Sequence, residues 1–139
     1  MRRRGERGAV STEFAVVMTG FLTAFMLLIV FAGRVAQAEN DVRSAAHEAA
    51  RAASLAGSPA QADADARQMA EANLSSSGLS CSDGLDVAVG LGQFQPGGWV
   101  SVTITCGASF SDLASLSVPG TRNFTSTATE VIDTYRSDP

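Results

Sequence analysis

The sequence predicts an α+β fold, in which a long N-terminal transmembrane helix extends into a small extracytoplasmic module with a second short helix and a three-stranded antiparallel sheet. Three observations predict this class. Residues 14–33 form an uncharged apolar run that continues into alanines at helical spacing, residues 57–59 read Gly-Ser-Pro and break the helix, and stretches after residue 79 alternate between apolar and polar residues. The helices therefore precede the strands along the chain.

The run at residues 14–33 has twenty residues, which at about 1.5 Å per residue is enough to cross a hydrocarbon core of roughly 30 Å. The basic leader before it contains Arg2, Arg3, Arg4 and Arg7. The positive-inside rule then places the N-terminus in the cytoplasm and the rest of the chain outside the cell. We expect a single-pass protein of the cell membrane.

The first helix is expected to run from about Thr12 to Ala56, because no helix breaker interrupts this stretch. Beyond the apolar run, small and apolar residues recur at helical spacing: Val35, Val42, Ala45, Ala46, Ala49, Ala53 and Ala56. Small side chains let another helix approach closely. This stripe is suited to a helix of another subunit, to the β-module of the same chain, or to both.

A second helix is predicted to begin at Pro59 and to end near Leu74. Gly57 fits a left-handed cap for the first helix, Ser58 fits an N-cap, and Gln61 occupies the capping-box position. The expected apolar side of this helix consists of Ala62, Ala66, Met69 and Leu74. Three serines and a glycine then close it.

Three strands are predicted after this helix. Residues 85–91 alternate between apolar and polar or small side chains, a Pro-Gly turn follows at residues 95–98, and residues 100–106 show the clearest period of two. Residues 122–134 are rich in threonine and β-branched side chains, which favours a third strand. The stretch 108–118 is expected to be irregular apart from one helical turn.

Cys81 and Cys106 both lie on the side of the membrane predicted to be outside the cell. A single pair of cysteines in an oxidising compartment favours one disulfide over two unrelated thiols. The bond is expected to join the first two strands and to add roughly 3 kcal/mol in the chain-entropy model. A sheet of this size needs such support because it buries little apolar surface.

Charge and motifs argue against several classes of function. The net charge is −4, and the chain after Gly8 would carry six basic against thirteen acidic residues, or −7. An acidic exported module disfavours nucleic acid as a partner. The single histidine, His47, has no helical partner for a metal, and no nucleophile or phosphate-binding motif is present. We therefore expect a non-enzymatic protein without metal or cofactor, in which His47 is a solvated surface residue.

A single carboxylate lies immediately before the apolar run. The leader ends at Gly8, four small or neutral residues follow from Ala9, and Glu13 then precedes Phe14. A charge at bilayer depth costs roughly 2.5–3.5 kcal/mol on insertion scales and less near an interface. The order of these residues resembles the processing site of type IV pilin precursors, in which a peptidase cuts between Gly8 and Ala9.

An ordinary secretory signal is the main rival reading of the N-terminus. Ala36-Gln37-Ala38 fits a signal-peptidase site, and cleavage there would release a binding domain. The apolar run is longer than the usual 7–15 residues of such a signal, and Arg34 separates it from the cut. The helical character of the surrounding sequence also disfavours cleavage after Ala38.

Over essentially its whole length the chain resembles the TadE-like family, the minor pseudopilins of the tight-adherence (Flp-type) pilus system, in the form seen in actinobacteria. The resemblance rests on the leader at residues 2–8, Ser-Thr-Glu-Phe at residues 11–14 and the alanine-rich helix at residues 45–53. It also includes Pro-Gly-Gly before the strand that ends at Cys106, and Thr-Ala-Thr-Glu at residues 127–130.

The resemblance implies a structural role in pilus assembly. Its partners would be the membrane, other pilins and pseudopilins, a prepilin peptidase and the inner-membrane platform of the pilus. Carried onto this chain, Gly8 precedes the cut, Ala9 is the new N-terminus and Glu13 is the assembly carboxylate. Phe14 stands where major Flp pilins usually have tyrosine, and those pilins lack a β-module, so the resemblance implies a minor subunit.

Four segments are therefore expected: a leader at 1–8, the transmembrane helix and its continuation at 9–56, a short helix and linker at 57–78, and a disulfide-linked β-module at 79–139. An uncleaved membrane-anchored assembly factor is the alternative within the same pilus system.

Overall fold

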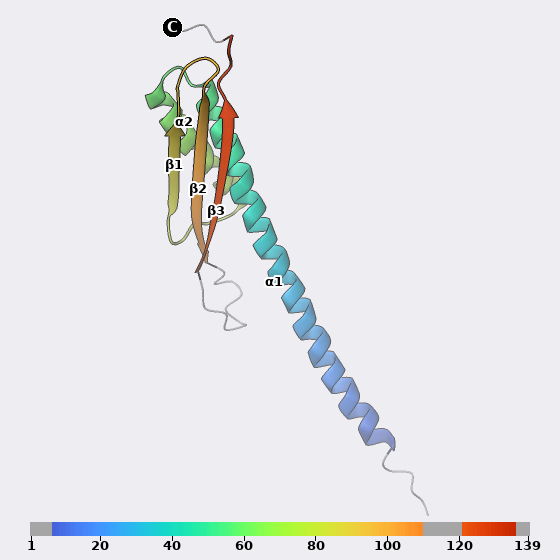
Figure 1. The fold of residues 1–139 in the computed structure, drawn as a ribbon. Helices are drawn as coiled ribbons and strands as arrows, with labels where there is room; N and C mark the ends of the chain where they lie inside the picture. The colour runs from blue at the N-terminus through green and yellow to red at the C-terminus, as the bar shows by residue number, and fades with distance from the viewer. Residues whose placement is uncertain (1–6, 110–120, 136–139) are drawn as a thin grey trace, which may run out of the picture. The chain divides into compact units, whose positions relative to one another are not determined.

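The computed structural model describes residues 7–109 and 121–135 and confirms the α+β class. Its elements are α1 (Arg7–Leu55), α2 (Pro59–Ser77), β1 (Leu85–Leu91), β2 (Trp99–Ser109) and β3 (Thr121–Val131), as Figure 1 shows. The chain divides into two compact units, Met1–Ala36 and Gln37–Pro139, and α1 contributes residues to both.

The alanine stripe of α1 is buried in the second unit. Its fully or almost fully buried residues are Ala38, Val42, Ala45, Ala46, Ala49, Ala50, Ala53 and, just past the helix, Ala56. The predicted stripe is confirmed from Val42 onward, but it is wider than predicted because Ala38 and Ala50 are also buried. Consecutive alanines such as Ala49 and Ala50 point to neighbouring sides of a helix, so α1 is covered on two sides.

The start of α2 agrees with the sequence prediction. Ser58 is the N-cap, with an extended backbone at φ −148° and ψ 160°, and Pro59 opens the helix. The Ser58 hydroxyl accepts a hydrogen bond from the backbone N–H of Gln61 at 3.3 Å. This bond satisfies one of the N–H groups that have no partner within the helix.

The N-cap makes a testable contribution to stability. We expect Ser58→Ala to lower the free energy of unfolding by about 1 kcal/mol, because the Gln61 N–H loses its acceptor. Ser76→Ala on the same helix is the matched control, since the Ser76 hydroxyl only donates to the carbonyl of Asn73 and is exposed. Urea unfolding should separate the two variants, and equal stabilities would contradict a capping role for Ser58.

Two details predicted for the helix pair are wrong. Gly57 does not adopt a positive φ angle, and α1 ends instead with a hydrogen bond from the Ala56 N–H to the carbonyl of Ala53, three residues earlier, at 3.3 Å. Met69 is 40% exposed, whereas Ala70 is fully buried. The buried residues of α2 follow one another at steps of four, at 62, 66, 70 and 74, and this spacing places Ala70 and not Met69 on the buried side.

The helix α2 continues three residues past its predicted end. Ser75, Ser76 and Ser77 stay helical, and each hydroxyl donates to the carbonyl three residues earlier at 2.8–2.9 Å. Gly78 then ends the helix in the left-handed conformation with φ 77°, and the Leu79 N–H bonds to the Leu74 carbonyl at 3.1 Å. This pattern of bonds terminates helices that end in glycine.

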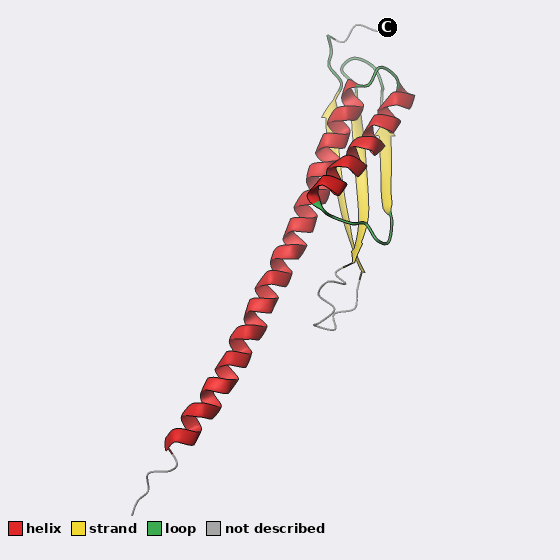
Figure 2. Cartoon of the chain, turned by 180° about the vertical axis from the view of Figure 1, so that it is seen from behind, coloured by secondary structure: helices red, strands yellow, loops and turns green. Residues whose placement is uncertain are grey.

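The sheet has the order β1-β2-β3, and both neighbouring pairs are antiparallel. The helices cover one face of it, as the views in Figures 1 and 2 agree. The largest fully buried side chains of the module are Ile104, Ile132, Val42, Val100, Val102 and Cys106. The core therefore lies between the helix layer and the inner side of β2, the central strand.

The predicted Pro-Gly turn joins β1 to β2. The Gly98 N–H bonds to the Gln95 carbonyl at 2.8 Å, and Gly97 supplies the positive φ of 80° that this turn requires. β3 ends at Val131, earlier than predicted, because Ile132 exchanges hydrogen bonds with the two glycines of this turn. Most of the stretch 108–118, including its predicted helical turn, lies outside the described residues.

Candidate functional site

The apolar part of α1 is exposed from Phe14 to Val30. Its large exposed side chains are Phe14, Val16, Val17, Met18, Phe21, Leu22, Phe25, Met26, Leu27, Leu28, Ile29 and Val30. The helix from Thr12 to Leu55 contains an 18-residue window with a mean hydropathy of 2.5, of which 0% is buried. By length and composition this helix can cross a membrane. Exposed apolar surface of this extent marks a membrane or protein contact.

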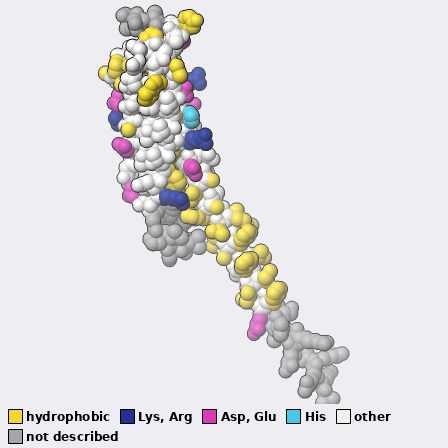
Figure 3. All heavy atoms as spheres, in the orientation of Figure 1, with side chains coloured by type: hydrophobic (Ala, Val, Ile, Leu, Met, Phe, Trp, Pro, Cys, Tyr) yellow, Lys and Arg dark blue, Asp and Glu magenta, His cyan; other side chains and the backbone are white. Residues whose placement is uncertain are grey.

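Glu13 lies at the beginning of this apolar surface. It is exposed, and no other charged residue occurs between Arg7, the first residue of α1, and Arg34. Figure 3 shows the hydrophobic atoms that gather along this part of the helix. The carboxylate therefore lies at the boundary between a polar leader and a membrane-length apolar helix, where a charge is tolerated more cheaply than at the bilayer centre.

The predicted cleavage site, Gly8 and Ala9, lies in the first turn of α1. The rival site, Ala36-Gln37-Ala38, lies in the interior of the same helix, and Ala38 is only 3% exposed. Helix ends open far more easily than helix interiors. The helix is therefore expected to open more easily at Gly8 than at Ala38.

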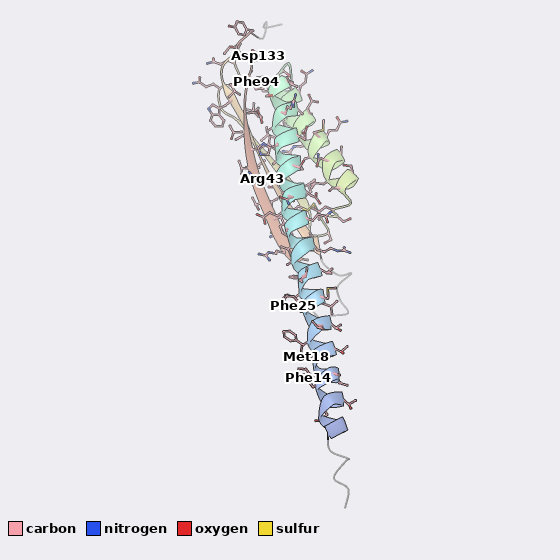
Figure 4. The ribbon with its side chains drawn as sticks, turned by 90° about the vertical axis from the view of Figure 1, so that its right-hand side faces the viewer. Phe14, Met18, Phe25, Arg43, Phe94 and Asp133 are labelled. Atoms are coloured by element: carbon pink, nitrogen blue, oxygen red, sulfur yellow. A yellow bond between two sulfur atoms is a disulfide. The ribbon has the colours of Figure 1, made fainter. Side chains whose placement is uncertain are left out.

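Bulky side chains gather on one side of the apolar helix. Phe14, Met18, Phe21 and Phe25 follow one another at steps of four, three and four residues, which places them on the same side. Figure 4 labels three of them. The rings of Phe21 and Phe25 stack with centroids 6.4 Å apart. This spacing is legible in the sequence, although the sequence analysis did not use it.

Glu13 shares its side of the helix with small residues. Gly20 and Ala24 follow it by seven and eleven residues, close to two and three full turns. The neighbouring Thr19 and Thr23 hydroxyls donate to carbonyls four residues earlier, each at 2.8 Å, so these donors are satisfied within the helix. A second helix can therefore approach this side closely at Gly20 and Ala24.

The predicted disulfide is confirmed, and its position is corrected. The sulfur atoms of Cys81 and Cys106 are 1.98 Å apart, and Cys106 lies fully buried in β2. Cys81 precedes β1, so the bond ties the α2–β1 loop to the central strand and does not join two strands. The loop turns at Gly84, where φ is 107° and the N–H bonds to the Cys81 carbonyl at 3.0 Å.

His47 is an exposed residue of α1, and its side chain lies close to the edge strand β3. Its Nδ1 atom is 4.0 Å from Oε1 of Glu130, and both side chains are about half exposed. Within residues 7–109 and 121–135 no three His, Cys, Asp or Glu side chains group in a way that could hold a metal ion. The expectation that the protein is not an enzyme stays a prediction.

A family comparison agrees with these features of α1. Residues 8–51 match the family model described as TadE-like protein. No curated protein and no solved structure matches the chain. The match begins at Gly8, includes Glu13 and the whole apolar run, and extends into the alanine stripe, whereas the predicted resemblance over the strands lies beyond it. Residues 8–51 of the chain are thus similar to the TadE-like family.

Proposed function

We propose that this protein is a minor pseudopilin of a tight-adherence pilus, trimmed after Gly8 and assembled through its N-terminal helix. The similarity of residues 8–51 to TadE-like proteins, a family associated with the tight-adherence pilus system, supports this setting. The observation that carries the proposal is the exposed, membrane-length apolar helix that opens with a single carboxylate, Glu13. When a subunit moves from a bilayer into a fibre, the apolar surface of its helix loses its contacts with lipid and gains contacts with neighbouring helices.

The proposed topology places the leader in the cytoplasm and the module outside. Two features support it. The basic residues of the leader favour the cytoplasmic side, and the Cys81–Cys106 disulfide suits an oxidising compartment. The module is thus proposed to be the part of the protein that other extracytoplasmic components meet.

Glu13 is proposed to set the register between subunits. Cleavage after Gly8 would create a free α-amine at Ala9, four residues before the carboxylate. Opposite charges within about 4–6 Å stabilise each other, more strongly where water is scarce. The amine of one subunit could pair with Glu13 of its neighbour while Gly20 and Ala24 let the two helices approach. The two conditions together would restrict the axial offset between the helices.

The experiment that tests processing is an intact-mass and N-terminal sequence determination on protein extracted from its native membrane. We expect the chain to begin at Ala9. A Gly8→Arg variant is the control and should retain Met1, because the residue before the cut is changed. Wild-type protein that begins at Met1 would favour the uncleaved membrane anchor.

A start at Glu39 would instead favour the secreted domain released after Ala38. The burial of Ala38 within α1 speaks against this rival, since the peptidase would have to unwind a packed part of the helix.

A further inference from the structure

The two cysteines of the disulfide differ in their access to solvent. Cys106 lies in the central strand β2 and is 0% exposed, like its inward-facing neighbours Val100, Val102 and Ile104. Cys81 lies in the loop between α2 and β1 and is partly exposed. A reagent from solvent therefore meets the sulfur of Cys81 first, whereas it reaches the sulfur of Cys106 only if the core opens.

A surface groove lies beside Cys81. It has a volume of about 300 Å³, and its lining includes Glu71, Leu74 and Ser75 of α2 together with the loop residues 78–81. This volume is at the lower end of the range for small-molecule sites, which is about 300–1,000 Å³. A short side chain or a small organic disulfide can therefore approach the loop at Cys81.

The loop that carries Cys81 is attached to β2 by backbone hydrogen bonds as well as by the disulfide. The Asp83 N–H bonds to the Gly107 carbonyl at 3.0 Å, and the Gly107 N–H bonds to the Gly84 carbonyl at 3.2 Å. Gly107 directly follows Cys106, and the Cα atoms of the two cysteines are 5.1 Å apart. These hydrogen bonds do not require a bond between the sulfur atoms. The loop can therefore hold Cys81 beside Cys106 in the dithiol form as well.

The contact between loop and strand depends on the absence of a side chain at Gly107. An added Cβ atom there would lie 2.6 Å from the Cβ atom of Asp83 and 3.4 Å from its Cα atom. Neither atom can move away unless the loop itself moves. Gly107 thus lets the loop lie against β2 at the level of Cys106.

We infer that the module folds as a dithiol and that its disulfide then forms by exchange through Cys81, with the disulfide of an exported thiol oxidoreductase as the oxidant. The Cys81 thiolate attacks one sulfur of the oxidant, which forms a mixed disulfide and releases the other oxidant sulfur as a thiolate. The Cys106 thiolate then attacks the Cys81 sulfur, which closes the bond and releases the second oxidant thiolate. Two electrons and the protons of both cysteines pass to the oxidant, whose disulfide becomes two thiols.

This inference concerns the module alone and depends neither on cleavage after Gly8 nor on Glu13. Its failure would leave the proposed pilus function untouched, because the disulfide is present whichever route forms it.

A brief pulse of iodoacetamide on chemically reduced wild-type protein tests whether the dithiol is folded with only Cys81 accessible. Full-length protein in detergent micelles is labelled with and without urea, and cleavage after Trp99 separates the peptides of the two cysteines. Without urea we expect about tenfold more label at Cys81 than at Cys106, because attack at Cys106 requires the core to open. In urea the two labels should be equal. Equal labelling without urea would overturn the inference.

The closing step is tested with hydroxyethyl disulfide, a small uncharged oxidant, added to the reduced protein. Intact mass after acid quenching separates dithiol, mixed disulfide and closed disulfide. Wild-type protein should close with little mixed disulfide, because Cys106 lies beside Cys81. Gly107→Ala should accumulate several times more mixed disulfide at Cys81, since the added methyl group displaces the loop. Gly90→Ala is the matched control and should behave as wild type, because its methyl group meets only the Ser101 hydroxyl, which can rotate away.

Two results of this experiment would overturn the inference. Mixed disulfide at both cysteines of the wild-type protein would mean that oxidation precedes folding. Closure of Gly107→Ala without additional mixed disulfide would mean that the loop contact with β2 does not position Cys81 for the closing step.

Discussion

Replacement of Glu13 by alanine is expected to abolish pilus assembly while membrane insertion stays at the wild-type level. Insertion should not suffer, because removing a carboxylate next to an apolar run lowers the cost of placing the helix in a bilayer. Assembly should fail, because the variant has no charge to pair with the amine of a neighbouring subunit. The loss of assembly would arise at the step at which the helices of neighbouring subunits align with one another.

Two measurements are needed, the amount of protein in the membrane fraction and the number of pili per cell. Glu48→Ala is the matched control, since Glu48 is also an exposed carboxylate on α1 but lies outside the apolar run. Glu13→Asp keeps the charge on a shorter side chain and should retain part of the assembly. Normal piliation in the Glu13→Ala strain would contradict the role proposed for this residue.

Removal of the disulfide is expected to have the largest effect on stability. The bond closes a loop with a sequence separation of 25, and in the chain-entropy model this contributes roughly 3 kcal/mol. The described part of the module has three strands and two helix segments around its core, so this is a large share of the 5–15 kcal/mol that is typical of a folded domain. We expect the Cys81→Ala/Cys106→Ala double variant to be mostly degraded after export.

Urea unfolding of the full-length protein in micelles, followed by Trp99 emission, measures this contribution at low protein concentration. Chemically reduced wild-type protein is the control, because it lacks the bond but keeps both sulfur atoms. If the reduced protein and the double variant lose similar amounts of unfolding free energy, the loss is due to the missing cross-link and not to the missing sulfur atoms. A loss below about 0.5 kcal/mol in both would contradict this contribution of the cross-link.

Much of the fold could be predicted from the sequence because its local signals agree with the final structure. The alternation through Val100, Val102 and Ile104 marks the inner face of β2, and all three are buried. The N-cap at Ser58 and the turn glycine at Gly97 are also where the sequence places them. In each case the determining interaction joins residues within a few positions of one another.

The errors arise where long-range packing decides between local alternatives. Met69 and Ala70 fit the apolar side of α2 about equally well by spacing, and close packing selects the smaller side chain. Cys81 could have lain in a strand, but the turn at Gly84 places it before β1. The sequence alone could not separate these outcomes, since each depends on how near another layer comes.

The candidate sites differ in the same way. The membrane helix, its opening Glu13 and the TadE-like character of residues 8–51 follow from the order of residues along the chain, because hydropathy and charge act locally and need no fold. The burial of Cys106 and the contact of the α2–β1 loop with Gly107 exist only after the sheet and the helix layer have packed. These features depend on segments far apart in sequence, and only the tertiary structure brings such segments together.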